Sequence, residues 1–219
     1  MDETQSTIFI IDDDASVRKS LQRLLRAHQY QVETFASGQD YLSREPFGGI
    51  GAIVLDIQMP GLTGMDVQSQ LLAQGANLPI IFLTGHGDIP TTVTAMKRGA
   101  VNFLTKPVDE TALLQTIRDG LQRHIKIHET SQDQEILRQR LSTLTSREHE
   151  VMRYVIGGAL NKQIAHQLDI AEKTVKVHRA HMLEKMRVTS VAELVRVCSD
   201  IGVSPLQTSK KFLTDETLG

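Results

Sequence analysis

The sequence contains only one cysteine, Cys198, among its 219 residues. A single cysteine can form neither an intrachain disulfide nor a cysteine-based zinc site, and we interpret Cys198 as a buried structural thiol. No stretch approaches about 18 consecutive apolar residues, so no membrane-spanning segment is predicted. The polar start "MDETQST" lacks the basic and apolar regions of a signal peptide, and we therefore expect a cytoplasmic protein without membrane contact.

The net charge of −2 conceals an uneven distribution of charged residues. Residues 1–122 contain 9 basic and 14 acidic residues, whereas residues 142–208 contain 9 basic and 7 acidic ones. The hydrophobic content of 40% is enough to form one large core or two modest ones. An acidic first part and a mildly basic second part indicate two domains of different character.

Short β-branched runs alternate with amphipathic stretches throughout residues 1–122. This alternation predicts βα units and a parallel sheet that is covered by helices on both faces. We expect five helices and five strands, with the strands at 7–12, 31–35, 50–55, 79–84 and 102–105.

The strand pattern stops after residue 141, and four helices are predicted up to residue 208. The first begins at "LTSREHEV", where Thr145 and Glu148 have the spacing of a capping box. A short helix in "NKQIAHQLDI" and a longer one in "EKTVKVHRAHMLEKM" then form the outline of a helix-turn-helix. Residues 123–141 are interpreted as a helical or flexible linker, and residues 209–219 as a loose tail.

Three adjacent carboxylates follow the first predicted strand in "FIIDDDAS". In a parallel open sheet, ligands bind beyond the carboxyl ends of the strands, near the point where the strand order reverses. We therefore expect this edge to gather residues that are distant in the chain. The residues that end predicted strands there are Asp12, Asp13, Asp56, Thr84 and Lys106.

Three carboxylates around one pocket suit a hard divalent ion, and Mg²⁺ fits best because it uses few carboxylates and binds phosphate. A lysine and a hydroxyl group nearby complete a site for a phosphoryl group. Asp14 is instead predicted to cap the helix that begins at Ala15. The histidines His124 and His128, four residues apart in the linker, are interpreted as solvated rather than as metal ligands.

Four blocks, "IIDDD", "LDIQMPGLTGMD", "FLTGHGD" and "FLTKP", resemble the signature blocks of CheY-like receiver domains. With the C-terminal half, they resemble two-component response regulators of the NarL/FixJ family. The resemblance implies a flavodoxin-like receiver over 1–122 and an all-α, LuxR-type helix-turn-helix domain over 142–208. It covers almost the whole chain except the linker and the tail.

The resemblance implies that Asp56 accepts a phosphoryl group from a sensor histidine kinase and forms an acyl phosphate. Asp12, Asp13 and Asp56 would hold Mg²⁺ together with the main-chain carbonyl of Gln58. A carboxylate is a workable nucleophile, and the metal offsets charge during phosphoryl transfer. Apart from self-phosphorylation and self-dephosphorylation at Asp56, no enzymatic activity is expected.

The resemblance also implies a switch behind the phosphoacceptor. Lys106 would pair with Asp56 or with the phosphate, and Thr84 would hydrogen-bond a phosphoryl oxygen. Movement of Thr84 would free space for Phe103, which stands where the family carries Phe or Tyr. The family's receivers dimerise on phosphorylation through the helix after Thr84 and the strand through Phe103.

The helix expected over 172–186 is the candidate recognition helix. At about 100° per residue, one face is directed at the core and holds Val175, His178, Met182 and Met186. The opposite face holds Lys173, Lys176, Val177 and Ala180. Ala171, at the N-cap position, caps a helix less well than serine or threonine, and Asp169 is a candidate to compensate.

Val177, flanked by Lys173 and Lys176, suits contact with a thymine methyl group, with lysine reaching guanine or phosphate. The family resemblance implies that Lys176, Val177 and Ala180 read bases. It implies phosphate contacts from Asn161, Lys162, Thr174, Arg179 and Lys185.

A net charge of +2 over 142–208 predicts weak binding to double-stranded DNA by a monomer, and dimerisation would double the contacts. The last helix has an apolar stripe that resembles the family's dimerising helix. The stripe consists of Val191, Leu194, Val195 and Cys198. By analogy with the family, RNA polymerase is a further expected partner.

The predicted function is a phosphorylation-activated, DNA-binding transcription regulator. One alternative is a haloacid-dehalogenase-type phosphatase with Asp12 as nucleophile and Asp14 as acid and base, since "DDD" fits the spacing D-x-D. That class needs a later G-D-x-x-x-D motif, but no second acid follows Gly87 and Asp88 at this spacing. Another alternative is a regulator that binds DNA without phosphate.

Overall fold

The computed structural model describes residues 6–85, 93–95 and 97–207. The chain forms two compact units, with the boundary between Glu129 and Thr130. They are called here the N-terminal unit and the C-terminal unit. We describe each unit by itself. The expected tail and the residues His86, Gly87 and Asp88 lie outside the described residues.

The N-terminal unit contains the predicted five-stranded parallel sheet, in the order β2-β1-β3-β4-β5. The order reverses at β1, which has β2 on one side and β3 on the other. The observed strands differ from the predicted ranges by at most one residue at either end. They are β1 (Thr7–Ile11), β2 (Gln31–Phe35), β3 (Gly51–Asp56), β4 (Ile80–Thr84) and β5 (Asn102–Thr105).

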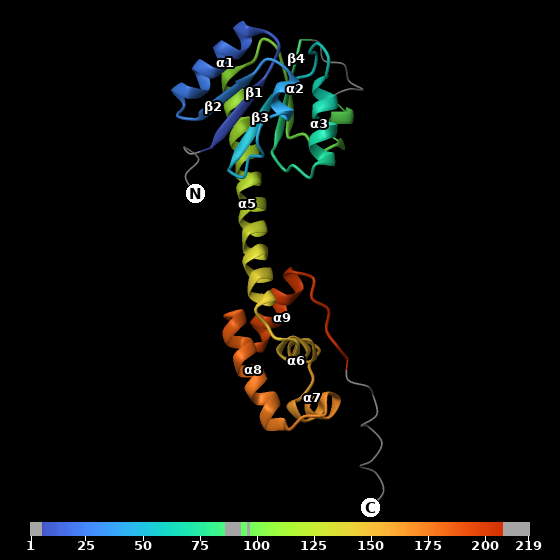
Figure 1. The fold of residues 1–219 in the computed structure, drawn as a ribbon. Helices are drawn as coiled ribbons and strands as arrows, with labels where there is room; N and C mark the ends of the chain where they lie inside the picture. Colours follow the sequence, from blue (N-terminus) through green and yellow to red (C-terminus); the bar gives the residue numbers. More distant parts are fainter. Residues whose placement is uncertain (1–5, 86–92, 96, 208–219) are drawn as a thin grey trace, which may run out of the picture. The chain divides into compact units, whose positions relative to one another are not determined.

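Helices cover both faces of this sheet, as the alternation of runs predicts (Figure 1). Helices α1 (Ala15–Ala27) and α5 (Glu110–Ser142) pack on one face, where Ile8 and Ile10 point. On the other face, α2 (Gly38–Leu42) and α3 (Gly64–Ala73) pack over Phe9 and Ile11, together with Ala95. Residues 93–95 and 97 also have helical backbone.

Helix α5 is continuous over 33 residues, so the segment expected to be a helical or flexible linker is helical. Leu113, Ile117 and Leu121 form a stripe at helical spacing that packs on the sheet. His124 continues this stripe, because it is 7% exposed and its Nδ1 accepts a hydrogen bond from the Gly51 N–H at 3.4 Å. The interpretation of His124 as a solvated residue is therefore wrong.

The C-terminal unit has the four predicted helices. Its core includes Val151, Ile164, Val175 and Leu194, and the end of α5 packs against it through Leu137. The capping box of Thr145 and Glu148 is confirmed. The four helices are α6 (Ser146–Ile156), α7 (Asn161–Leu168), α8 (Glu172–Met186) and α9 (Val191–Asp200).

Glu148 links the start of α6 to the end of α8. Its carboxylate is 4% exposed, and the Lys185 Nζ lies 2.6 Å from its Oε2. Burial alone would raise the pKa of this carboxyl group, but hydrogen bonds from Lys185 and Thr145 outweigh burial and hold the pKa below its usual range. The ionised carboxylate therefore contributes stability that is complete above the ordinary pKa of glutamate and declines as the pH falls through the lowered value.

We expect Glu148→Gln to destabilise the C-terminal unit by about 1–2 kcal/mol at neutral pH, because hydrogen bonds to an ionised group become neutral ones. The loss stays modest because the Lys185 side chain is 35% exposed and can turn to water. Native-state hydrogen exchange at the amides of α6 and α8 measures this loss for the C-terminal unit alone. The difference from the unsubstituted chain should shrink in acid, where both carry a neutral side chain.

The matched control is Glu150→Gln. The Glu150 carboxylate is 2.9 Å from Arg147, but both side chains are about half exposed, at 45% and 52%. An exposed pair at this spacing contributes little. Equal losses in the two variants would contradict the anchoring role of Glu148.

Candidate functional site

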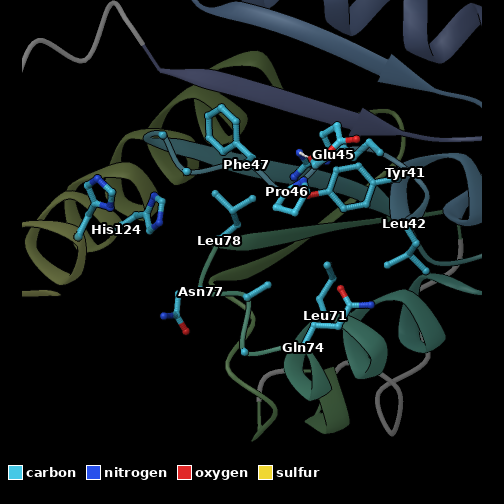
Figure 2. A pocket seen from close by; sticks show the side chains of 16 residues that line it. Tyr41, Leu42, Glu45, Pro46, Phe47, Leu71, Gln74, Asn77, Leu78 and His124 are labelled. Carbon is cyan, nitrogen blue, oxygen red and sulfur yellow. Dashed lines mark hydrogen bonds between the residues drawn. The ribbon is translucent and has the colours of Figure 1, made fainter. Parts of the chain in front are cut away.

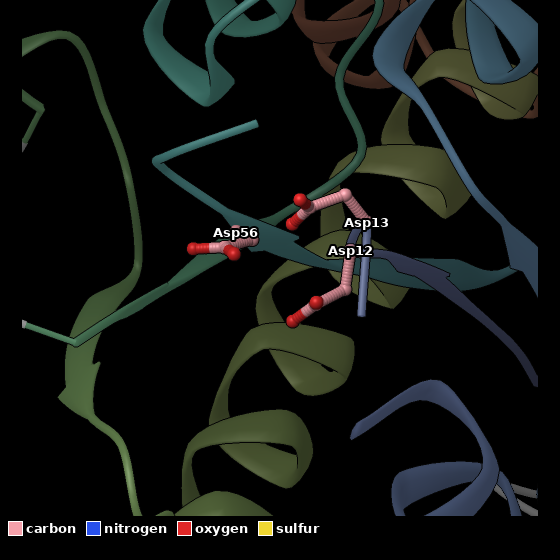
Figure 3. A group of neighbouring side chains, drawn as sticks. All are labelled: Asp12, Asp13 and Asp56. Atoms are coloured by element: carbon pink, nitrogen blue, oxygen red, sulfur yellow. The ribbon is translucent and has the colours of Figure 1, made fainter. Parts of the chain in front are cut away.

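Three carboxylates meet where the strand order reverses (Figure 3). Asp12 and Asp13 directly follow β1, and Asp56 is the last residue of the neighbouring β3. One oxygen from each of the three lies within 4.8 Å of the others. Asp12 and Asp56 are buried and Asp13 is exposed, so the cluster opens to solvent on one side.

Lys106 supplies the positive charge that this cluster needs. Its Nζ donates to Asp12 Oδ2 at 2.6 Å and to Asp56 Oδ2 at 2.8 Å. Burial lowers the pKa of this ammonium group, but the two carboxylates outweigh burial and raise it. Burial raises the pKa of Asp12, with the nearby charge of Asp56 as a smaller contribution, although Lys106 opposes both effects.

The pairing of β5 with β4 positions Lys106. β5 is the edge strand beside β4, and the Lys106 N–H donates to the main-chain oxygen of Thr84 at 2.7 Å. Thr84 ends β4 and is 2% exposed. The structure thus brings Thr84 and Lys106 to the edge that holds Asp56, as predicted from their places at strand ends.

Phe103 and Gln58 flank this site. Phe103 is half-buried on β5 and lies opposite Phe82 of β4, with ring centroids 6.3 Å apart. Gln58 is exposed, and its N–H donates to Asp56 Oδ1 at 3.3 Å. The main chain of Gln58 therefore lies beside the Asp56 carboxylate.

Asp14 has the capping role predicted for it. Its Oδ1 accepts from the Ser16 N–H and Oγ, both at 2.7 Å, and from the Val17 N–H at 3.4 Å. The hydrogen bonds from Ser16 hold the pKa of this carboxyl group below its usual range. The triplet "DDD" therefore combines two functions, because Asp12 and Asp13 belong to the cluster and Asp14 belongs to α1.

Sequence reasoning missed two residues that shape the site. The Arg18 Nη1 donates to the main-chain oxygen of Asp12 at 2.6 Å. No sequence signal distinguishes Arg18 from the other cations of α1. Gly64 begins α3, and a Cβ atom there would clash with the main-chain oxygen of Asp56. The glycine of "LTGMD" was the available signal, since glycine permits close backbone approach.

The faces predicted for the recognition helix are confirmed in α8. Val175, Met182 and Met186 are buried, and His178 is half-buried on the same side. Val177 is 45% exposed. The other residues predicted to point outward, Lys173, Lys176 and Ala180, are exposed. Ala171 makes no side-chain cap bond, and Asp169 ends α7 instead of compensating.

Several residues expected to contact phosphate have partners inside the protein. The Arg179 Nη1 donates to Asn161 Oδ1 at 3.1 Å, across the helix-turn-helix, and Lys185 is paired with Glu148. The physical reason is that α8 packs on both α6 and α7, which brings its polar flanks against their first turns. Lys162 and Thr174 are exposed.

The stripe predicted on α9 divides between core and surface. Leu194 and Cys198 are buried, which confirms the interpretation of Cys198 as a buried thiol. Val191 and Val195 are 37% and 42% exposed. Only the two valines therefore remain for an intermolecular contact.

Residues 8–118 match the family model described as "Response regulator receiver domain". Residues 142–198 match "Bacterial regulatory proteins, luxR family". The chain belongs to the response-regulator family. This response regulator is 40% identical to Nodulation protein W of Bradyrhizobium diazoefficiens over 94% of its own length and 91% of the relative's. It is 37% identical to the transcriptional regulatory protein FixJ of Rhizobium meliloti, over 92% and 99% of the two chains.

Two solved structures support this assignment over most of the chain. The response regulator StyR is 46% identical, with a TM-score of 0.83 over 89% of this chain and 98% of that one. Full-length FixJ from B. japonicum is 37% identical, with a TM-score of 0.55 over 90% and 97% of the two chains.

The domain pair makes this response regulator a phosphorylation-dependent, DNA-binding transcription regulator. Its family consists of regulators rather than enzymes, which removes the support for the phosphatase alternative. Receiver domains bind Mg²⁺ through an acidic cluster, and Asp12, Asp13 and Asp56 form such a cluster. Among the described residues, no helix combines the length and apolar character needed to cross a membrane.

We expect Asp14→Ala to loosen the first turn of α1 without disturbing the carboxylate cluster. Without the side-chain acceptor, the amides of Ser16 and Val17 lose their partner and should exchange with solvent several-fold faster. Hydrogen exchange followed by NMR measures these two amides directly. Asp13→Ala is the control, and a similar change in that variant would contradict the division of the triplet.

Proposed function

We propose that Asp56 is the phosphoacceptor of this response regulator and that a sensor histidine kinase is the phosphoryl donor. The observation that carries this proposal is the position of the Lys106 Nζ, which bridges Asp12 and Asp56 at 2.6 and 2.8 Å. An ammonium group held there can neutralise negative charge on a phosphoryl group attached to Asp56.

The donor set fits Mg²⁺. Three carboxylates with oxygens inside 4.8 Å, one side of the cluster exposed, suit a small hard ion that keeps several waters. We assign Asp12, Asp13, Asp56 and the main-chain carbonyl of Gln58 as its ligands. When bound, the ion would offset the negative charge of the transferred phosphoryl group and of the attacking carboxylate.

Asp56 then acts as the nucleophile. One of its oxygens attacks the phosphorus of the phosphohistidine in line with the P–N bond, which breaks as the new P–O bond forms. Lys106 moves its hydrogen bond from the carboxylate to a phosphoryl oxygen, and the Thr84 hydroxyl donates to another. Self-phosphorylation by small phosphodonors and self-dephosphorylation at Asp56 belong to the same proposal.

Thr84 and Phe103 couple phosphorylation of Asp56 to a conformational change at β5. Thr84 is buried at the end of β4, and Phe103 lies half-buried on the adjacent β5 against Phe82. Movement of Thr84 toward the phosphoryl group opens space into which the Phe103 ring turns. The surface around β5 changes shape, which favours a homodimer of phosphorylated chains.

In the C-terminal unit, α8 is the recognition helix for double-stranded DNA. Val177 contacts a thymine methyl group, and Lys176 and Ala180 contact neighbouring base edges. Their exposure on one face of α8 supports this assignment. Phosphate contacts come first from exposed residues, which are Lys162, Lys173 and Thr174. Arg179, Asn161 and Lys185 would have to leave their internal partners to reach phosphate.

The domain division belongs to this proposal, with a receiver over 1–122, a helical linker over 123–141 and a LuxR-type domain over 142–208. Dimerisation through Val191 and Val195 of α9 would double the phosphate contacts. RNA polymerase is a proposed partner at the promoter. The cytoplasmic location stays a prediction.

Acetyl phosphate with Mg²⁺ should add one phosphoryl group to the unsubstituted chain, as measured by intact mass. Asp56→Asn should gain none, because an amide is not a nucleophile of this kind. Removal of Mg²⁺ with a chelator should abolish the gain in the unsubstituted chain as well.

Asp14→Asn is the matched control, since it removes a neighbouring carboxylate that caps α1, and it should gain the phosphoryl group. An unmodified unsubstituted chain would contradict the proposed role of Asp56. If phosphorylation occurs but DNA affinity is the same before and after it, the protein binds DNA without needing phosphate.

Two substitutions in the C-terminal unit should separate positioning from base reading. A preferred DNA site is first selected from random duplexes. Lys162→Gln should then weaken binding to all sequences and reduce the salt slope, which is the slope of the logarithm of the binding constant against the logarithm of the salt concentration, by about 1. Val177→Ala should keep the slope and lower the ratio of specific to non-specific affinity several-fold, because a methyl contact is lost.

The control is Lys19→Gln on the exposed side of α1, which removes the same charge from the N-terminal unit. It should leave both the slope and the affinity ratio unchanged. An equal reduction of the salt slope in the Lys19 and Lys162 variants would contradict the assignment of Lys162.

A further inference from the structure

The N-terminal unit has a pocket beside the amino ends of β3 and β4 (Figure 2). Asp56 is at the other, carboxyl end of β3. The pocket has a volume of about 530 Å³ and lies between the segment that precedes β3, the segment that precedes β4 and helix α5. Volumes of this size are typical of sites for small organic ligands. The phosphoacceptor mechanism uses no residue of this pocket.

One part of the pocket wall is apolar and partly aromatic. Tyr41 and Phe47 contribute rings, and Leu71 and Leu78 contribute aliphatic surface from the other side (Figure 2). Phe47 is half-buried and its ring meets that of Phe9 edge to face at 5.0 Å between centroids. Such a wall favours a ligand with a flat apolar body.

Arg44 is the one cation of this pocket wall that carries a charge at all ordinary pH values. Its guanidinium carbon lies 4.4 Å from the ring centroid of Phe9 and 4.6 Å from that of Tyr41. In the described residues, its donors reach two neutral oxygens, the main-chain oxygen of Glu45 at 2.8 Å and the Tyr41 hydroxyl at 3.0 Å.

Within the part of the chain that the structure describes, no carboxylate forms an ion pair with Arg44. Its buried Nε–H also has no acceptor there. Cations held against apolar surface are normally paired with an anion. Glu45 also lines the pocket, but it is exposed and forms no ion pair with Arg44, so the guanidinium group offers hydrogen-bond donors that no described anion occupies.

His124 of α5 contributes a further donor to the pocket wall. The His124 Nδ1 accepts from Gly51, so the proton of the neutral ring is on Nε2, which is a donor. Burial, together with the nearby His128, lowers the pKa of His124, which keeps the ring neutral. Both rings line the pocket, with centroids 6.1 Å apart.

We propose that this pocket binds a small aromatic carboxylate, with its ring against Phe47 and Leu78 and its carboxylate toward Arg44. Bound there, the ligand contacts α5 at His124 and His128. The site is independent of Asp56, and it does not require that Asp56 be phosphorylated.

The test uses the full chain with 2-naphthoate as the probe and 2-naphthamide as a neutral analogue. Calorimetry should detect naphthoate binding at least tenfold tighter than naphthamide binding, because only the carboxylate pairs with Arg44. Absence of naphthoate binding, or equal binding of the two probes, overturns the proposal.

Three variants locate the site. Arg44→Gln should weaken naphthoate binding tenfold or more and leave naphthamide binding unchanged. Asn77→Trp places a large ring at an exposed position of the pocket wall and should block both probes without requiring any change in the packing of Arg44. Ala73→Trp adds the same ring to an exposed position of α3 outside the wall and should bind as the unsubstituted chain does.

Two further measurements distinguish ligand binding at this pocket from binding at the phosphoacceptor site around Asp56. Asp56→Asn should bind naphthoate with unchanged affinity. In the unsubstituted chain, naphthoate should shift the NMR signals of the Gly51 amide and the His124 ring and slow hydrogen exchange over residues 122–129. Loss of binding in Asp56→Asn, or shifts confined to the cluster around Asp56, would overturn the assignment.

Discussion

The balance of charge between Lys106 and the carboxylates of Asp12 and Asp56 is the constraint on which the N-terminal unit depends. Two buried carboxylates at adjacent strand ends repel each other and lose hydration, and a single ammonium group within 2.8 Å of both offsets these costs. The strand order places the carboxyl ends of the paired strands β1 and β3 side by side, at the point where the order reverses and where ligands bind in open parallel sheets. The charges of Asp12, Asp56 and Lys106 offset one another, so a phosphoryl group or a metal ion added at this site changes the electrostatic balance among them.

Helix α5 is the element that both units share. Its first half contributes Leu113, Ile117 and Leu121 to the core of the receiver, and its last turns contribute Leu137 and Leu141 to the core of the LuxR-type domain. Each end of α5 thus packs within a different unit. Its middle section at His124 also forms part of the wall of the pocket beside β3 and β4, and the Arg140 Nη1 near its end donates to the main-chain oxygen of Met186 in α8 at 3.3 Å.

Much of the architecture was predictable because it follows from local patterns. Alternation of apolar runs located the five strands to within one residue at either end, and spacing located the capping box of Thr145 and the outward face of α8. Placement at strand ends also grouped Asp12, Asp56 and Lys106 correctly, since parallel strands bring their carboxyl ends to one edge. The prediction that His124 is solvated is wrong because its hydrogen-bond partner, Gly51, is 73 residues away in the chain and no local pattern indicates this contact.

The sequence by itself determined the order of elements, the acidic edge and the family, since each depends on residue types at short spacings. Only the tertiary structure decided which polar side chains are already engaged, as Arg179 is with Asn161 and Lys185 is with Glu148. It also decided that Arg44 lies among three aromatic rings without a carboxylate partner in the described chain. The reason is physical: hydrogen bonds and ion pairs depend on distances of about 3 Å between groups that are far apart in the chain, and only packing sets those distances.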